Sequence, residues 1–140
     1  MAETGYNWGA WAFAKDGAGA DWDDKELADN ATVISNTAIS LDGIAACEVG
    51  IAIDEDAAGA IDGVVTVFVL GSGAGIADEE TTIGSPWSFT ITPEVSDVVY
   101  KRFSVSPAEY GDFKIAMLNE GGQPLDMSVK YRTATIPVAS

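Results

Sequence analysis

The sequence has no histidine and a single cysteine, Cys47. Histidine is the commonest general base and the commonest ligand of transition metals, so its absence argues against most acid–base and metal-dependent catalysis. One cysteine excludes an intrachain disulfide, an iron–sulfur cluster and a cysteine zinc site. We therefore expect no catalytic, cofactor-binding or metal-binding residues, and we interpret the chain as a protein that is not an enzyme.

Basic residues are also scarce, because 7 Lys and Arg stand against 22 Asp and Glu, for a formal net charge of −15. So acidic a chain repels phosphate-rich polymers and anionic lipids, and we expect neither nucleic acid nor a membrane as its partner. Hydrophobic runs stay well below the roughly 18 residues of a membrane span. Residues 1–4 lack the basic and apolar regions of a secretory signal, so we expect a protein made in the cytoplasm and not secreted.

What the chain does contain is a series of short segments in which apolar and polar residues alternate, the period of a half-buried strand. Turn residues separate these segments, and Asp42-Gly43 and Asp62-Gly63 in particular predict short hairpin turns. The pattern favours an all-β fold, an antiparallel β-sandwich of jelly-roll type with about seven or eight strands. The predicted strands are residues 32–41, 48–53, 64–70, 88–92, 98–105, 112–118 and 127–136.

Two of these segments carry further information. Residues 64–70 are nearly all apolar, which predicts a central strand covered on both faces. Residues 127–136 place Ser128, Lys130 and Arg132 on one side of a strand and apolar residues on the other. With a length of 140 residues, the chain fits one domain, which we divide into an N-terminal segment, residues 1–30, and a β-sandwich, residues 31–140.

The N-terminal segment is acidic and unusually aromatic, and we interpret it as an extended arm or an edge of the sandwich. Tyr6, Trp8, Trp11 and Phe13 lie within eight residues and are separated by small residues. A continuous strand would place Tyr6 and Trp8 on one face and Trp11 and Phe13 on the other. These rings pack on the domain's own sheets, dock onto another subunit, or do both, and we select them as the candidate assembly interface.

Other candidate sites have simpler interpretations. A calcium site needs six to eight oxygen ligands, and the acidic groups do not show the spacing of an EF-hand, so we interpret them as surface acids. Gly71–Gly75 lacks the Lys-Ser/Thr ending of a phosphate-binding loop and reads as a connection between strands. Cys47 enters a predicted strand and is expected to be a small buried apolar residue. The acidic groups are Asp21, Asp23 and Asp24; Asp54, Glu55 and Asp56; and Asp78, Glu79 and Glu80.

The stretch from Tyr100 to Leu125 carries a resemblance. It runs as a strand, a turn at Pro107-Ala108-Glu109-Tyr110-Gly111-Asp112, a second strand, and an Asn119-Glu120-Gly121-Gly122 turn. In this order of strands and turns it is similar to small β-sandwich virion proteins of tailed bacteriophages. Residues 30–136 as a whole resemble these proteins in general style, and residues 100–125 resemble them more closely. The resemblance implies a capsid decoration or cement protein that binds the head in many copies. Its partners would be the major capsid protein, other virion subunits and copies of itself, a trimer being one arrangement, and its location would be the virion.

An alternative function remains open, that of a carbohydrate- or receptor-binding module of a fibre or tail tip. Sugars stack on exposed aromatic rings and bond to neighbouring polar groups, often beside calcium. Exposure of Trp22 or Trp87 next to the acidic loops would favour this second function.

Overall fold

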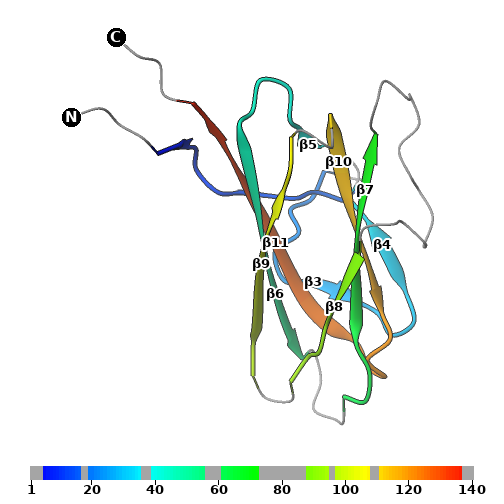
Figure 1. Ribbon diagram of the computed structural model, residues 1–140. Coiled ribbons are helices and arrows are strands. Elements are labelled where there is room, and N and C mark those ends of the chain that lie inside the picture. Colours follow the sequence, from blue (N-terminus) through cyan, green and yellow to red (C-terminus); the bar gives the residue numbers. More distant parts are fainter. Residues whose placement is uncertain are drawn as a thin grey trace.

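The computed structural model describes residues 5–16, 19–35, 39–55, 61–72, 88–94, 97–107 and 111–136 (Figure 1). Within these ranges the chain forms no helix and 11 strands, which make two antiparallel sheets. The prediction of an all-β, antiparallel fold is therefore confirmed. The strands are β1 (Asn7–Trp8), β2 (Ala12–Phe13), β3 (Lys25–Leu27), β4 (Thr32–Ile34), β5 (Ile39–Ser40), β6 (Ala46–Glu55), β7 (Val65–Ser72), β8 (Ser88–Ile91), β9 (Val99–Val105), β10 (Asp112–Asn119) and β11 (Leu125–Thr135).

Each sheet is built on a pair of long strands. The first sheet has the order β1-β11-β6-β9, and β2 and β3 also pair with β11. The second sheet has the order β4-β10-β7-β8, and β5 also pairs with β10. Strands that follow one another along the chain therefore mostly lie in different sheets, and among the described strands only β7 and β8 are consecutive and paired.

This connectivity corrects the expected hairpins. The Asp42-Gly43 turn is present, with Gly43 at φ 71°, but it leads from β5 in the second sheet to β6 in the first. Asp62-Gly63 likewise precedes β7, which pairs with β10 and β8 and not with β6. Both hairpin predictions are wrong, because a local turn signal does not determine whether the chain returns within its own sheet or crosses to the other.

The expected number of strands is also corrected. The region before residue 41 is broken into short strands, so that 11 are formed where seven or eight were predicted. β1, β2 and β3 pair in succession with β11, and β4 and β5 both pair with β10. The additional strands are therefore pieces of two longer edge segments whose pairing is interrupted.

The two sheets share one hydrophobic core, as in a β-sandwich. Inward-facing residues of β6 and β11, such as Ile51 and Val129, belong to the same buried cluster as Ile115 of β10 and Val67 of β7. Strand β7 is covered on its other face too, where Phe68 and Leu70 form a smaller buried cluster with Ala116. The prediction that residues 64–70 form a central strand buried on both faces is confirmed.

The N-terminal segment takes part in this core. Trp22 and Leu27 are completely buried in the main cluster. The backbone holds Trp22 in place, because its N–H donates to the Ala14 carbonyl at 2.7 Å and its carbonyl accepts from the Val129 N–H at 2.9 Å. The indole Nε1 of Trp22 is buried and has no hydrogen-bond partner among the described residues. This segment is therefore fixed to β11 by sheet pairing and by one large core side chain.

Candidate functional site

The outer face of the first sheet is built in rows across β11, β6 and β9. In the central row, Lys130 is paired with Gly50, and Gly50 with Arg102. The next row places Ser128, Ala52 and Tyr100 side by side. Because side chains alternate along a strand and Ile51 and Val129 point into the core, the residues of both rows face outward.

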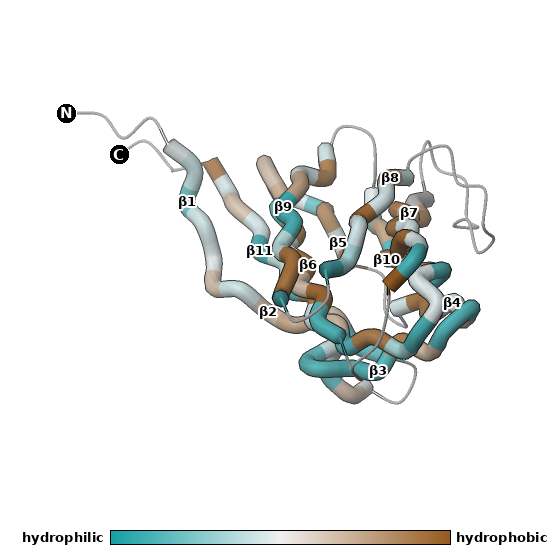
Figure 2. The backbone as a smooth tube through the Cα atoms, turned by 90° about the horizontal axis from the view of Figure 1, so that it is seen from below, coloured by the Kyte–Doolittle hydropathy of each residue, from teal (hydrophilic) through white to brown (hydrophobic). Residues whose placement is uncertain are grey.

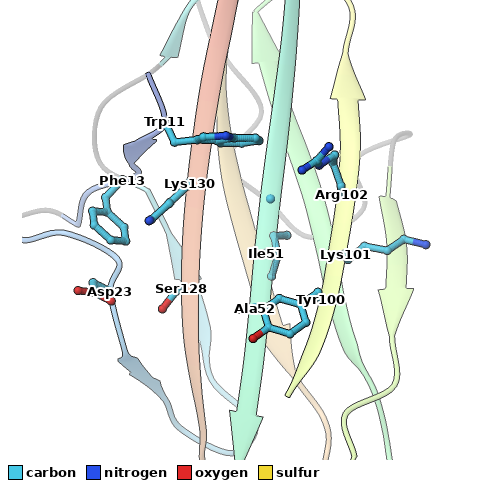
Figure 3. A pocket seen from close by; sticks show the side chains of 11 residues that line it. Trp11, Phe13, Asp23, Ile51, Ala52, Tyr100, Lys101, Arg102, Ser128 and Lys130 are labelled. Atoms are coloured by element: carbon cyan, nitrogen blue, oxygen red, sulfur yellow. The ribbon is translucent and has the colours of Figure 1, made fainter. Parts of the chain in front are cut away.

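Small residues in the middle of these rows leave an open hollow of about 600 Å³, here called the outer hollow (Figure 3). Ala52 and Ser128 line its open base, because neither has a side chain long enough to fill the space, and beside them the Trp11 ring packs over Gly50. On one side lie residues of the N-terminal segment, and on the other lie residues of β9. The side residues are Trp11, Phe13 and Asp23, and Tyr100, Lys101 and Arg102.

Aromatic rings and guanidinium groups alternate along one end of the outer hollow. The guanidinium of Arg132 lies between two indoles, 4.3 Å from the Trp8 centroid and 4.8 Å from the Trp11 centroid. The guanidinium of Arg102 lies 5.5 Å from the centroid of the same Trp11 ring. Such cation–π contacts each contribute about 0.5–2 kcal/mol, depending on exposure. They hold the aromatic segment flat against the sheet.

Glu48 joins the two arginines. Its Oε1 accepts from Arg132 Nη2 at 2.8 Å, and its Oε2 lies 3.6 Å from Arg102 Nε. The Glu48 and Arg132 side chains are mostly buried, whereas the Arg102 side chain is 65% exposed. One carboxylate therefore orients both guanidinium groups, and Arg102 keeps most of its donors directed to solvent.

The cations of this region are unusual in so acidic a protein. Three of the chain's seven Lys and Arg residues, Arg102, Lys130 and Arg132, have side chains on this face. Lys101 is paired with the inward-facing Ile51, and its side chain points away from the hollow (Figure 3). The Lys130 ammonium lies 4.6 Å from the Phe13 centroid, and that of Lys101 lies 5.9 Å from the Phe89 centroid. Within the described part of the chain, no ion pair joins either lysine to a carboxylate. The outer hollow is thus a basic region on a protein of net charge −15.

The structure brings the predicted aromatic residues to one face. Trp8, Trp11 and Phe13 all lie over cations of β11, so the expectation that Trp8 faces away from Trp11 and Phe13 is wrong. The cause is the break between β1 and β2, which changes the direction of successive side chains. Of the two packing alternatives, these three rings contact the protein's own sheet.

Tyr6 is placed differently, at the end of the β1–β11 pair. β11 extends past the last residue paired with β6, Ala134, and is there paired only with β1. Tyr6 and Ile136 lie one residue beyond the Asn7–Thr135 pair and are 52% and 70% exposed. Figures 1 and 2 show this end of the ribbon reaching away from the two sheets.

Three other candidates are placed as follows. Trp22 is completely buried and offers no ring to a sugar. Cys47 is 1% exposed, and burial, with a smaller contribution from the charge of Glu48, raises the pKa of its thiol to about 11. In the ranges that the structure describes, no three Asp, Glu or Cys residues gather in a group fit to hold a metal ion. Asp56, Gly73–Gly75, Asp78, Glu79, Glu80 and Trp87 lie outside these ranges.

Sequence reasoning did not select Tyr100, Arg102 or Glu48 for this site. The available signal was the alternation of Ser128, Lys130 and Arg132 on the polar side of one predicted strand. The sequence does not show which strands lie next to this one. The pairing of β11 with β6 and of β6 with β9 is what places Gly50 between Lys130 and Arg102.

Comparison with models of known protein families finds no match to this chain, and comparison with curated proteins finds none. In the part of the chain that the structure describes, no helix has the length and apolar character needed to cross a membrane.

Proposed function

We propose that this chain is a structural virion protein of a tailed phage, a capsid decoration or cement protein that binds the head lattice in many copies. The resemblance of residues 100–125 to small phage virion proteins supports this function. The single observation that supports it most is the exposed apolar pair at the end of the β1–β11 ribbon, Tyr6 and Ile136.

The strand order supports a jelly-roll fold for this protein. When β1–β3 are taken as one interrupted strand and β4–β5 as another, the described residues form eight strands in two four-stranded sheets. Successive strands then alternate between the sheets, apart from the paired β7 and β8. Eight strands in two sheets with crossing connections are typical of jelly rolls, which are frequent among viral capsid domains and lectins.

The ribbon end supports a docking role for the N-terminal segment as an arm. Tyr6 packs edge-on against Trp8, with ring centroids 6.0 Å apart, while Trp8 is held by Arg132. A Tyr ring fixed in this way loses little side-chain entropy when it is buried by a partner. Aromatic residues of this kind are frequent anchors of protein interfaces. The partners would be the major capsid protein, other virion subunits and further copies of this chain.

Binding in many copies requires only a modest affinity at each site, because avidity across a lattice raises the overall affinity. The acidic remainder of the surface would keep decorated particles apart in solution. Both properties agree with a decoration protein.

The test is co-sedimentation with heads of the encoding phage, combined with quantitative mass spectrometry of purified virions. The proposal expects many copies per particle. Replacing Tyr6 and Ile136 by Ser should lower the bound fraction about tenfold, as expected for loss of two interface anchors. Ile34→Ser is the matched control, because Ile34 is 38% exposed on β4, in the other sheet. Absence of the chain from virions, or equal loss of binding in the control, would contradict the proposal.

A second function, a carbohydrate- or receptor-binding module of a fibre or tail tip, is favoured by one observation. Trp11, Phe13 and Tyr100 surround the outer hollow, where a sugar ring could stack. Binding to a glycan array without binding to heads would select this function over the first.

A further inference from the structure

The outer hollow has the size and composition of a small-ligand site. Its volume of about 600 Å³ lies within the range of typical ligand pockets, roughly 300–1,000 Å³. Rings of Trp11, Phe13 and Tyr100 stand at its sides, and Ala52 and Ser128 form a low base between them (Figure 3). Flat apolar surfaces next to a shallow base suit a ring-shaped ligand that stacks on one face.

Charge restricts the ligand further. Lys130 and Arg102 flank Gly50 in the same row, two strand spacings apart, or about 10 Å between their backbones. Among the described residues, the Lys130 ammonium has only the Phe13 ring as a partner, and the Arg102 side chain is 65% exposed. In a chain with 22 acids, two cations at one hollow that are left open to solvent indicate a site for a carboxylate.

The positions of these groups are fixed before any ligand binds. Glu48 and the Trp11 ring hold Arg102, and the Phe13 ring holds Lys130. The Ser128 hydroxyl accepts a hydrogen bond from the Asp24 N–H at 2.9 Å, which leaves its own proton free to be donated to a ligand. Asp23 places a carboxylate beside the same base, where it can accept from sugar hydroxyls. Such preorganisation lowers the entropic cost of binding.

We propose that the outer hollow binds one acidic sugar residue, a pyranose bearing a carboxylate, at the end of an otherwise neutral glycan. The carboxylate binds to Lys130 and Arg102 beside the Trp11 ring that covers Gly50, and the sugar ring lies over Ala52 and Ser128 against the Tyr100 ring. A single anionic residue is favoured over a polyanion, because a net charge of −15 repels a chain of many negative charges. This inference rests on the second function proposed above and names its sugar class, and it does not depend on head binding through Tyr6 and Ile136.

The test is a two-dimensional NMR titration of the isotope-labelled full chain with methyl β-D-glucuronide and with N-acetylneuraminic acid. Methyl β-D-glucoside is the matched neutral probe, since it differs from the glucuronide only in carrying a hydroxymethyl group in place of the carboxylate. A Kd of about 1 mM is expected for one acidic sugar, from the usual binding energy per atom of small ligands. Shifts should concentrate at Gly50, Ala52, Ser128 and the Trp11 indole, and the neutral sugar should bind at least about tenfold more weakly.

Two variants test the assigned contacts. Lys130→Gln should weaken binding of the acidic sugar about tenfold and leave the weak binding of the neutral one unchanged. Lys114→Gln is the control, because it changes the net charge equally but lies on β10 in the other sheet. Tyr100→Ala should weaken both sugars, and since the Tyr100 side chain is exposed, the fold is retained.

Each contrary outcome is specific. No shifts with either acidic sugar at 20-fold the expected Kd, or equal affinity for glucuronide and glucoside, overturns the proposal. Tighter binding of a short oligothymidylate than of the sugars also overturns it, in favour of a single-stranded nucleic-acid site. A failure here leaves virion binding through Tyr6 and Ile136 intact, and loss of virion binding leaves the sugar titration unaffected.

Discussion

The ring of Trp11 lies over Gly50, with two ring carbons 3.7 and 3.9 Å from the place that a Cβ of residue 50 would occupy. Gly50 is in the middle of β6, between Lys130 of β11 and Arg102 of β9. A glycine in a strand interior gives up side-chain packing, and here the indole supplies that packing from outside the sheet. The same ring then contacts both arginines, so the missing side chain at residue 50 positions the whole aromatic–cation series.

Substitutions at Gly50 should therefore have opposite effects according to size. In Gly50→Ala the new Cβ makes an ordinary contact with Trp11, and the loss of glycine flexibility should leave stability unchanged or raise it by up to about 1 kcal/mol. In Gly50→Val the γ-carbons displace the ring, and we expect a loss of about 1–3 kcal/mol. Urea unfolding measures both. A Val variant as stable as the Ala variant would show that Trp11 is not held against the sheet.

Glu48 should be the most sensitive charged residue of this face. Glu48→Gln removes the carboxylate shared by Arg102 and Arg132, of which Arg132 is mostly buried. We expect the free energy of unfolding to fall by about 1.5–3 kcal/mol, the usual range for a hydrogen bond to a charged group. Glu120→Gln is the control, since Glu120 is exposed and should change stability by less than about 0.5 kcal/mol. Equal effects of the two substitutions would contradict the bridging role.

The strands and their buried faces could be predicted from the sequence, but their partners could not. Alternation is a local property, so it predicts the strands at residues 112–118 and 127–136, which the structure confirms with their inward residues in the core. Which sheet a strand joins depends on the crossing of distant segments, so the turn residues at Asp42-Gly43 and Asp62-Gly63 predict hairpins that the structure does not form.

For the candidate site, the same limit applies to individual side chains. Trp8, Trp11 and Phe13 were selected from their clustering in the sequence. Their common face depends on the break between β1 and β2 and on the cations of β11 beneath them, which no local pattern reveals. Trp22, by contrast, lies in a Gly- and Asp-rich stretch and is a core residue because its backbone is paired with Ala14 and Val129.

Asn119 should be indispensable to the end of the sandwich where β10 leads to β11. Its buried side chain donates to the carbonyls of Leu27 and Gln123 at 2.9 and 2.8 Å, and accepts from the Gly121 N–H at 2.8 Å. Asn119→Ala leaves three buried backbone groups without these partners. Since each costs about 1–3 kcal/mol, we expect a loss of about 3 kcal/mol or more.

Thermal unfolding, followed by circular dichroism, measures the effect of Asn119→Ala. Asn30→Ala is not a suitable control, because Asn30 has φ 60°, which an alanine adopts only with strain. Glu120→Ala is suitable, because Glu120 follows Asn119 in the same turn and is exposed. A loss below about 1 kcal/mol in Asn119→Ala would show that water replaces these bonds.

The Cys47 thiol should make stability depend on pH above pH 9. Burial, and to a smaller extent Glu48, raises its pKa from 9.0 to about 11 in the folded protein. Between these values the folded thiol keeps its proton while the unfolded thiol loses it, so the unfolded state binds fewer protons and stability falls as pH rises. The contribution of this group is fully present below pH 9 and is lost by about 1.4 kcal/mol per pH unit up to about pH 11.

Urea unfolding between pH 8 and pH 11 measures this slope. All other groups are common to the native chain and to Cys47→Ala, so the difference between the two slopes isolates the thiol. The variant should be less stable at pH 8, through lost packing, and should show the shallower decline. Parallel slopes, or rapid alkylation of the folded protein by iodoacetamide at pH 8, would mean that the thiol is accessible and ionises at an ordinary pH.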